Sequence, residues 1–159
     1  MTSIGGTMGS ISVSGIGFAA LTLALAALPM NAPKATLTSS LDVSINGKRS
    51  AKGNVLVCLT ANPKAFPDCS KDPKARTAKF AATSTAVSFD GLAPGAYAIS
   101  MIHDENANGK MDVRVFLPKE GFGFSRNPAI TFGPPKFGAA AFQVNVGENA
   151  QAVKLKYML

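Results

Sequence analysis

Short stretches in which apolar and polar residues alternate recur along most of this chain, and they are the strongest constraint on its fold. In 96–103, for example, Tyr97, Ile99 and Met101 occupy every second position, which places them on one face of a strand. Turn-forming residues separate the stretches, and no apolar stripe of helical period follows residue 36. The sequence therefore predicts an all-β fold, an antiparallel sandwich of about seven strands. The predicted strands are 36–46, 54–60, 76–81, 85–89, 96–103, 140–146 and 151–159, the last two as a C-terminal hairpin.

Residues 1–33 contain no Lys, Arg, Asp or Glu, and the stretch 11–28 is mostly Ala, Leu, Ile, Gly and Ser. An apolar N-terminal stretch of this kind is typical of a secretory signal peptide. We therefore expect 1–35 to be a signal or hydrophobic segment and 36–159 to be a single domain, located in the periplasm or outside the cell. The alternative is an uncleaved membrane anchor through residues 11–29, because this stretch approaches the roughly 20 residues that span a bilayer.

Cys58 and Cys69 are the only cysteines in the chain. An even number of cysteines in an exported protein favours a disulfide, which would close the short loop between these two residues. A metal-binding or redox-active pair is the weaker alternative, because the spacing is not Cys-x-x-Cys.

The chain is basic, with 16 Lys and Arg against 9 Asp and Glu and a net charge of +7. The basic residues are scattered without a run of five, and no aromatic residues of the stacking kind are interleaved with them, so we expect no nucleic-acid partner. A weak association with the cell envelope or another anionic surface stays open.

The segment 103–112 holds the densest cluster of oxygen donors in the sequence. Calcium loops of the EF-hand kind supply oxygen from positions 1, 3, 5, 7 (a backbone carbonyl), 9 and 12, with glycine at position 6. The spacing fits from Asp104 to position 9 with Gly109 at position 6, but position 12 is Val115 in place of a glutamate, so we expect weak calcium-type binding. Glu120 could reach the loop, although nothing in the spacing requires it. A turn held by its own hydrogen bonds is the competing interpretation. The predicted ligands are Asp104, Asn106, Asn108, the carbonyl of Lys110, and Asp112.

His103, the only histidine, ends the inward-facing row of the strand 96–103. A hydrogen-bonded structural role is the favoured interpretation. The alternative is a general base in a small hydrolase or isomerase, with Asp104 or Asp112 orienting the ring. A transition-metal site normally needs a second soft or borderline ligand, and the chain offers no second histidine.

The segment 113–136 is rich in proline and glycine. Together with the residue that follows it, this segment holds five of the ten phenylalanines in the chain. Burying a phenylalanine side chain gains about 1.5–3 kcal/mol, so we expect this segment to fold over one end of the sandwich, beside the Asp104 loop. It would act as a structural lid or, alternatively, line a ligand pocket. The residues of this candidate lid are Phe116, Phe122, Phe124, Phe132 and Phe137.

Three blocks, 103–110, 118–125 and 132–137, occur in the same order as in a bacterial family of small exported proteins, domain of unknown function 2141, which this chain resembles. The approach to the histidine, 90–97, is similar too, and the likeness covers roughly 41–159. The resemblance implies an exported immunoglobulin-like or transthyretin-like β domain and no enzymatic activity. The pair Cys58 and Cys69 departs from the family pattern.

The sequence thus favours an exported, non-enzymatic β-sandwich binding or structural module with a weak calcium loop. The alternatives are a small hydrolase or isomerase that uses His103, and an envelope-associated basic protein.

Overall fold

The computed structural model describes residues 5, 6, 9, 38–131 and 133–159. The chain divides into two units, Met1–Lys34 and Ala35–Leu159, and every strand among the described residues lies in the second unit. The predicted anchor 11–29 lies outside the described residues, as does the predicted signal segment 1–35 apart from residues 5, 6 and 9, so both stay predictions. Within the described part of the chain, no helix is long and apolar enough to cross a membrane.

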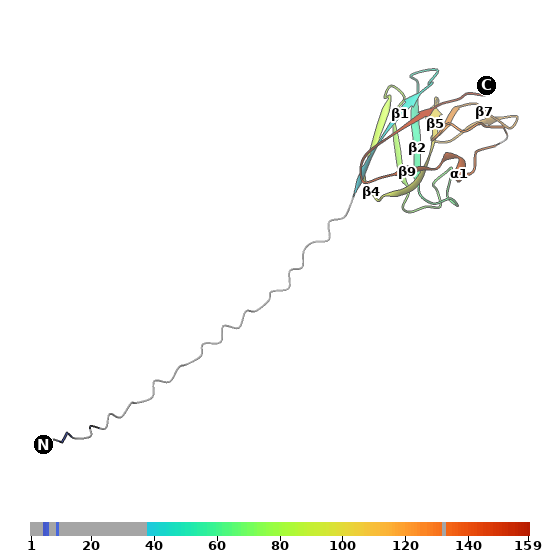
Figure 1. Cartoon of the computed structure of the whole chain (residues 1–159). Coiled ribbons are helices and arrows are strands. Elements are labelled where there is room, and N and C mark those ends of the chain that lie inside the picture. The colour runs from blue at the N-terminus through green and yellow to red at the C-terminus, as the bar shows by residue number, and fades with distance from the viewer. Residues whose placement is uncertain (1–4, 7–8, 10–37, 132) are drawn as a thin grey trace. The chain divides into compact units, whose positions relative to one another are not determined.

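The second unit is a sandwich of two main sheets, shown in Figure 1 with some of its strands labelled. One sheet has the strand order β10-β1-β4; the other has the order β3-β2-β5-β8, with β9 paired to β5. A small hairpin, β6–β7, stands apart from both sheets. The elements are β1 (Ser39–Asn46), β2 (Asn54–Thr60), β3 (Arg76–Ala81), β4 (Ala86–Leu92), β5 (Gly95–Asp104), β6 (Val113–Arg114), β7 (Leu117–Pro118), β8 (Gly121–Phe124), α1 (Phe137–Ala140), β9 (Phe142–Val144) and β10 (Gly147–Lys154).

The core lies between the two main sheets, and the alternation seen in the sequence creates it. Every second residue of β1 is buried, so Leu41 and Val43 meet residues such as Leu59 of β2 and Met101 of β5 in one cluster. Both buried clusters draw their members from the second unit, which therefore has a core of its own. The predicted all-β sandwich is confirmed.

The C-terminal part of the chain differs from the prediction. The predicted hairpin of 140–146 with 151–159 is wrong, because β9 pairs with β5 in one sheet and β10 pairs with β1 in the other. The β1–β10 pairing is parallel, whereas the prediction was entirely antiparallel. The physical reason is that alternation specifies which face of a strand is buried but not which strand is its neighbour. Val144 and Val153 are both buried as the pattern requires, on opposite sheets.

The predicted disulfide is confirmed: it joins Cys58 on β2 to Cys69 in the loop that follows, with the two Cα atoms 5.8 Å apart. Both cysteines are buried. The hydroxyl of Ser100 on β5 donates a further hydrogen bond to the carbonyl of Pro67 in this loop. Disulfides persist mainly in oxidising compartments.

Candidate cation loop

The loop after β5 is organised around Asp104, whose side chain is fully buried. One carboxylate oxygen accepts a hydrogen bond of 3.0 Å from the backbone N–H of Asn108, and the other accepts one of 2.7 Å from the N–H of Gly109. Gly109 has a φ of +81°, a conformation that glycine adopts without strain. The side chain of Asp104 therefore holds the backbone of Asn108 and Gly109 in a curve around its carboxylate.

The next two alternate side chains continue this curve. The amide oxygen of Asn106 accepts a hydrogen bond from the N–H of Asn108 (3.1 Å), and that of Asn108 accepts one from the N–H of Lys110 (3.0 Å). Their amide nitrogens donate to the same oxygen of Asp112, at 2.8 and 2.9 Å. These bonds, that of Asn106 above all, hold the pKa of Asp112 below its ordinary value. The structure thus brings Asn106, Asn108 and Asp112 together, as the spacing predicts.

In this arrangement the amide nitrogens, rather than the amide oxygens, face Asp112. Among the described residues, no three His, Cys, Asp or Glu side chains are placed to hold a metal ion as they stand. Rotating the two amide groups would exchange nitrogen for oxygen and direct two further oxygen donors towards Asp112. A cation would therefore bind here only by replacing hydrogen bonds that the loop already makes.

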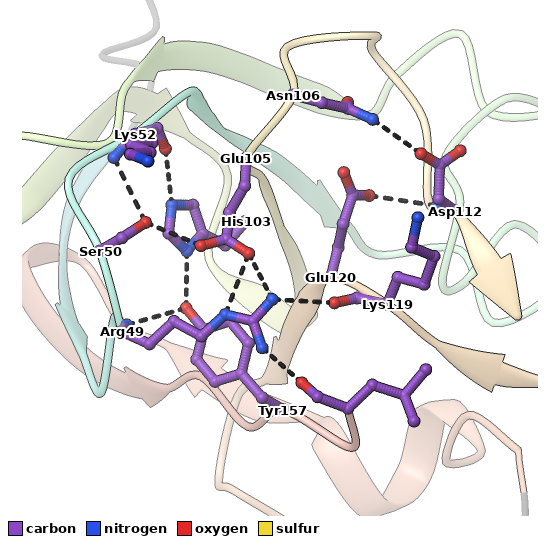
Figure 2. Close-up of polar contacts among 11 residues, drawn as sticks. Arg49, Ser50, Lys52, His103, Glu105, Asn106, Asp112, Lys119, Glu120 and Tyr157 are labelled. Atoms are coloured by element: carbon purple, nitrogen blue, oxygen red, sulfur yellow. Dashed lines mark hydrogen bonds and ion pairs between the residues drawn. The ribbon is translucent and has the colours of Figure 1, made fainter.

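Glu120 is the site residue that the predicted ligand set omitted. Its side chain is buried, with a relative exposure of 4% for the residue, and one carboxylate oxygen accepts a hydrogen bond of 3.1 Å from the N–H of Asp112, as Figure 2 shows. The other oxygen, Oε1, is buried and has no hydrogen-bond partner among the described residues. Burial raises the pKa of Glu120, and the negative charges of Asp104 and Asp112 raise it further.

The β6–β7 hairpin explains how Glu120 reaches the loop. After Asp112 the chain runs away from the Asp104 loop, turns at Val115 and Phe116, and runs back towards it. The N–H of Lys119 then donates to the carbonyl of Asp112 at 2.9 Å. Glu120 then follows directly. The sequence signal for this hairpin was weak, because its two turn residues are not the asparagine and glycine that usually mark such a turn.

His103 is fully buried, and both its ring nitrogens are in hydrogen bonds, as Figure 2 shows. Nε2 lies 2.9 Å from the carbonyl oxygen of Lys52, which can only accept, so Nε2 carries the proton. In the neutral ring Nδ1 then accepts from the hydroxyl of Tyr157 at 2.6 Å. These partners are neither Asp104 nor Asp112, and the ring is closed to solvent. The structural interpretation of His103 therefore stays the favoured one, and neither predicted carboxylate orients the ring.

Arg49 lies over Tyr157, the residue whose hydroxyl bonds His103. It donates from Nε to Glu105 at 3.0 Å, and its guanidinium lies 4.4 Å from the centre of the Tyr157 ring. The Ser50 hydroxyl donates to the other oxygen of Glu105 at 2.7 Å. The hydrogen bond from Arg49 is the main reason that the pKa of Glu105 lies below its ordinary value. Glu105, at position 2, thus serves this surface network rather than the loop.

The residues of the candidate aromatic lid do not act as one unit. Phe122 and Phe124 are buried and pack with Phe66 and Phe137, whereas Phe116 is 97% exposed. Phe132 lies outside the described residues. A shallow groove lined by Phe66, Phe137 and several prolines borders the buried aromatic cluster. A ligand-binding role for these residues stays a prediction.

One comparison with known proteins gives a match. The sequence profile of the family described as "Uncharacterized protein conserved in bacteria (DUF2141)" matches residues 43–152, which is more than half of the 159-residue chain. The matched region contains the Asp104 loop, the β6–β7 hairpin and Glu120. Neither a curated protein nor a solved structure matches the chain.

Proposed function

The chain belongs to the bacterial family DUF2141, and we propose that it is an exported, non-enzymatic β-sandwich module whose Asp104 loop binds a calcium-type cation weakly. The family description carries no activity, so the proposal rests on the geometry of the loop. The two-sheet architecture with mostly antiparallel pairing supports an immunoglobulin-like or transthyretin-like variant of the sandwich.

The observation that carries the proposal is the unpartnered oxygen of Glu120. A buried polar atom without a partner is costly, and the cost is larger when neighbouring groups have the same charge. Glu120 lies beside Asp104 and Asp112, so its Oε1 faces this cost in the absence of a proton or a cation. A bound cation would compensate all three carboxylates together.

The number and kind of donors fit calcium. Three carboxylates, the amide oxygens of Asn106 and Asn108, and the carbonyl of Lys110 make six oxygen donors, the lower end of the range that calcium takes. Because several of these atoms must first give up hydrogen bonds within the loop, we expect a dissociation constant of about 10⁻⁴–10⁻³ M, as in extracellular modules.

Two features support export. The buried disulfide is of the kind that persists in oxidising compartments, and the charge-free stretch 1–33 resembles a signal segment. Extracellular calcium-binding modules have dissociation constants in the same range of about 10⁻⁴–10⁻³ M, so the proposed location and affinity agree.

The proposal is tested by thermal melts of Ala35–Leu159 in millimolar calcium and in chelator. At a calcium concentration ten times the dissociation constant, binding adds about 1.4 kcal/mol to the free energy of unfolding, or roughly 5 °C in melting temperature for a domain of this size. Glu120→Gln should remove most of this increase, because it removes the charge but keeps the shape. Glu148→Gln, at an exposed position in β10, is the matched control and should keep it.

Glu120→Gln is a sharper variant than Asp104→Ala, because Asp104 also holds the loop backbone through the hydrogen bonds from Asn108 and Gly109. A calcium-dependent increase that survives Glu120→Gln would place the cation elsewhere. No increase in the wild-type domain at any calcium concentration would show that the loop is a self-bonded turn.

A further inference from the structure

The β6–β7 hairpin leaves a group of apolar side chains largely exposed to solvent. The relative exposures are 63% for Val113, 81% for Val115, 97% for Phe116 and 42% for Leu117. None of the four belongs to either buried cluster of the described residues. The two short strands pair with each other, and the label β7 in Figure 1 marks the hairpin at the margin of the β domain.

The turn of this hairpin is built from residues that are unfavourable for its backbone. Val115 and Phe116 have φ values of +49° and +66°, and positive φ at both central residues is the pattern of a type I′ turn. Such turns strongly prefer asparagine and glycine, and a β-branched residue at positive φ is strained. Val115 and Phe116 therefore weaken the turn, and they gain nothing from burial in return.

The apolar tip is flanked by positive charge. Arg114 lies within the hairpin, and Lys110 and Lys119 lie near its base; all three side chains are exposed. Glu120 is buried, and the half-buried Asp112, whose pKa Lys110 and Lys119 help to lower, offsets only part of this positive charge. The projecting part of the hairpin is thus apolar at its end and cationic along its sides.

We infer that this hairpin docks the domain onto an anionic lipid bilayer, with Val115 and Phe116 entering the interface and the basic side chains contacting the headgroups. Apolar side chains combined with nearby Lys and Arg are what peripheral binding to anionic membranes requires. The inference goes beyond the proposed cation site and does not depend on it, because the tip and its charges are present without a cation.

The size of the tip favours a bilayer over a folded protein partner. One phenylalanine side chain contributes about 150–250 Å² of buried surface, so four small or medium apolar residues fall well short of the roughly 800 Å² per partner of a standard protein interface. A narrow projecting tip also has no concave surface to receive a partner. A lipid interface accepts such a tip without shape complementarity.

The first test is co-sedimentation of Ala35–Leu159 with phosphatidylcholine vesicles, with and without phosphatidylglycerol, in chelator. The apolar stretch 11–28 is outside this segment and so cannot contribute to binding. The wild-type domain should partition onto the anionic vesicles. The double variant Val115→Asn with Phe116→Gly should bind at least about tenfold more weakly than the wild type, because the apolar surface is lost.

This double variant also separates binding from folding. Asn-Gly is the preferred pair for the turn, so its melting temperature should equal or exceed that of the wild type. Val146→Asn, which changes another exposed valine (54%), is the matched control and should bind as the wild type does. Failure of the wild type to bind anionic vesicles, or equal binding by the double variant, would overturn the inference.

The charge contribution has its own matched pair. Arg114→Gln with Lys119→Gln should weaken binding more than Lys64→Gln with Lys79→Gln, which removes the same charge from exposed positions outside the hairpin. Equal weakening by both pairs would show that the scattered net charge of +7 is responsible, and would contradict the role of the hairpin flanks.

Insertion itself is measured with a fluorescent side chain at the tip. The chain contains no tryptophan, so Phe116→Trp introduces a single reporter. Its emission should shift to shorter wavelength on addition of anionic vesicles and be quenched by brominated acyl chains. Val146→Trp should show neither effect. An unchanged emission from position 116 would rule out insertion.

Discussion

At the scale of single residues, the sequence offered two candidate functional groups, His103 and the Asp104 loop, and the structure places them in different surroundings. His103 is closed from solvent by Lys52 and Tyr157, while the loop at Asp104 gains a carboxylate, Glu120, that the spacing did not require. The burial of the lone histidine was predictable because it ends an inward-facing strand row. Glu120 was not, because its position depends on a hairpin with an atypical turn.

The pH dependence of stability tests the environment of Glu120. Because burial raises its pKa, the folded domain keeps this proton at pH values where the unfolded chain, with an ordinary pKa of about 4.3, has lost it. In chelator the free energy of unfolding should therefore fall as pH rises between these two pKa values. The fall should be absent in Glu120→Gln, and calcium should reduce it. Urea denaturation of both forms between pH 4 and 8 measures the difference, and a difference that is flat or rises with pH would contradict this assignment.

Asp112 and Glu105 change the free energy of unfolding with pH in the opposite direction to Glu120, and in a lower pH range. Their pKa values are below the ordinary ones, so the stability that they contribute is lost as pH falls through those lowered values. Subtracting the Glu120→Gln curve from the wild-type curve removes this shared contribution.

The structural role of His103 gives a second prediction at this scale. Tyr157→Phe removes the hydroxyl that donates to Nδ1 and leaves a buried ring nitrogen without a partner, which should lower the free energy of unfolding by about 1–3 kcal/mol. Tyr97→Phe is the matched control, because its hydroxyl donates to the carbonyl of Ala93 at an exposed position. Equal effects of the two changes, measured by urea denaturation, would argue against a special role for the buried pair.

At the scale of elements, β8 shows what the sequence could and could not specify. Its glycines alternate with phenylalanines over Gly121–Phe124, and the structural reason for this alternation appears only in the fold. A Cβ on Gly121 would lie 2.5 Å from Cζ of Tyr157, and one on Gly123 would lie 2.8 Å from Cγ1 of Val153. The glycines allow the C-terminal segment to pack directly over this strand.

Gly121→Ala should consequently destabilise the domain by about 1–3 kcal/mol, the usual effect of overpacking. Gly138→Ala is the matched control: a Cβ there meets no atom of the described residues within 4 Å, and alanine is the better helix former in α1. Thermal melts of the two variants should therefore move in different directions. An unchanged melting temperature for Gly121→Ala would show that the Tyr157 ring moves aside easily.

At the scale of the whole molecule, the sequence determined the fold class and the disulfide but not the sheet neighbours. Period-two alternation predicted β1, β2 and β5. The presence of two cysteines in a domain expected to be exported predicted the disulfide. The parallel β1–β10 pairing and the separation of β9 from β10 depend on contacts between distant parts of the chain, which local patterns do not encode. The approach of Asn106 and Asn108 to Asp112 follows from local spacing, whereas the position of Glu120 depends on the β6–β7 hairpin.

The most direct test of the calcium-loop proposal is a calcium titration of ¹⁵N-labelled Ala35–Leu159 followed by NMR. The amide signals of Asn108, Gly109 and Lys110 should move and saturate at millimolar calcium, because their N–H groups bond the side chains that would turn to the cation. Amide signals from β3, which lies in the same sheet as β5 but away from the loop in sequence, should not move. Saturating shifts confined to the loop and lost in Glu120→Gln are the predicted result, and a spectrum unchanged by calcium would contradict the cation site.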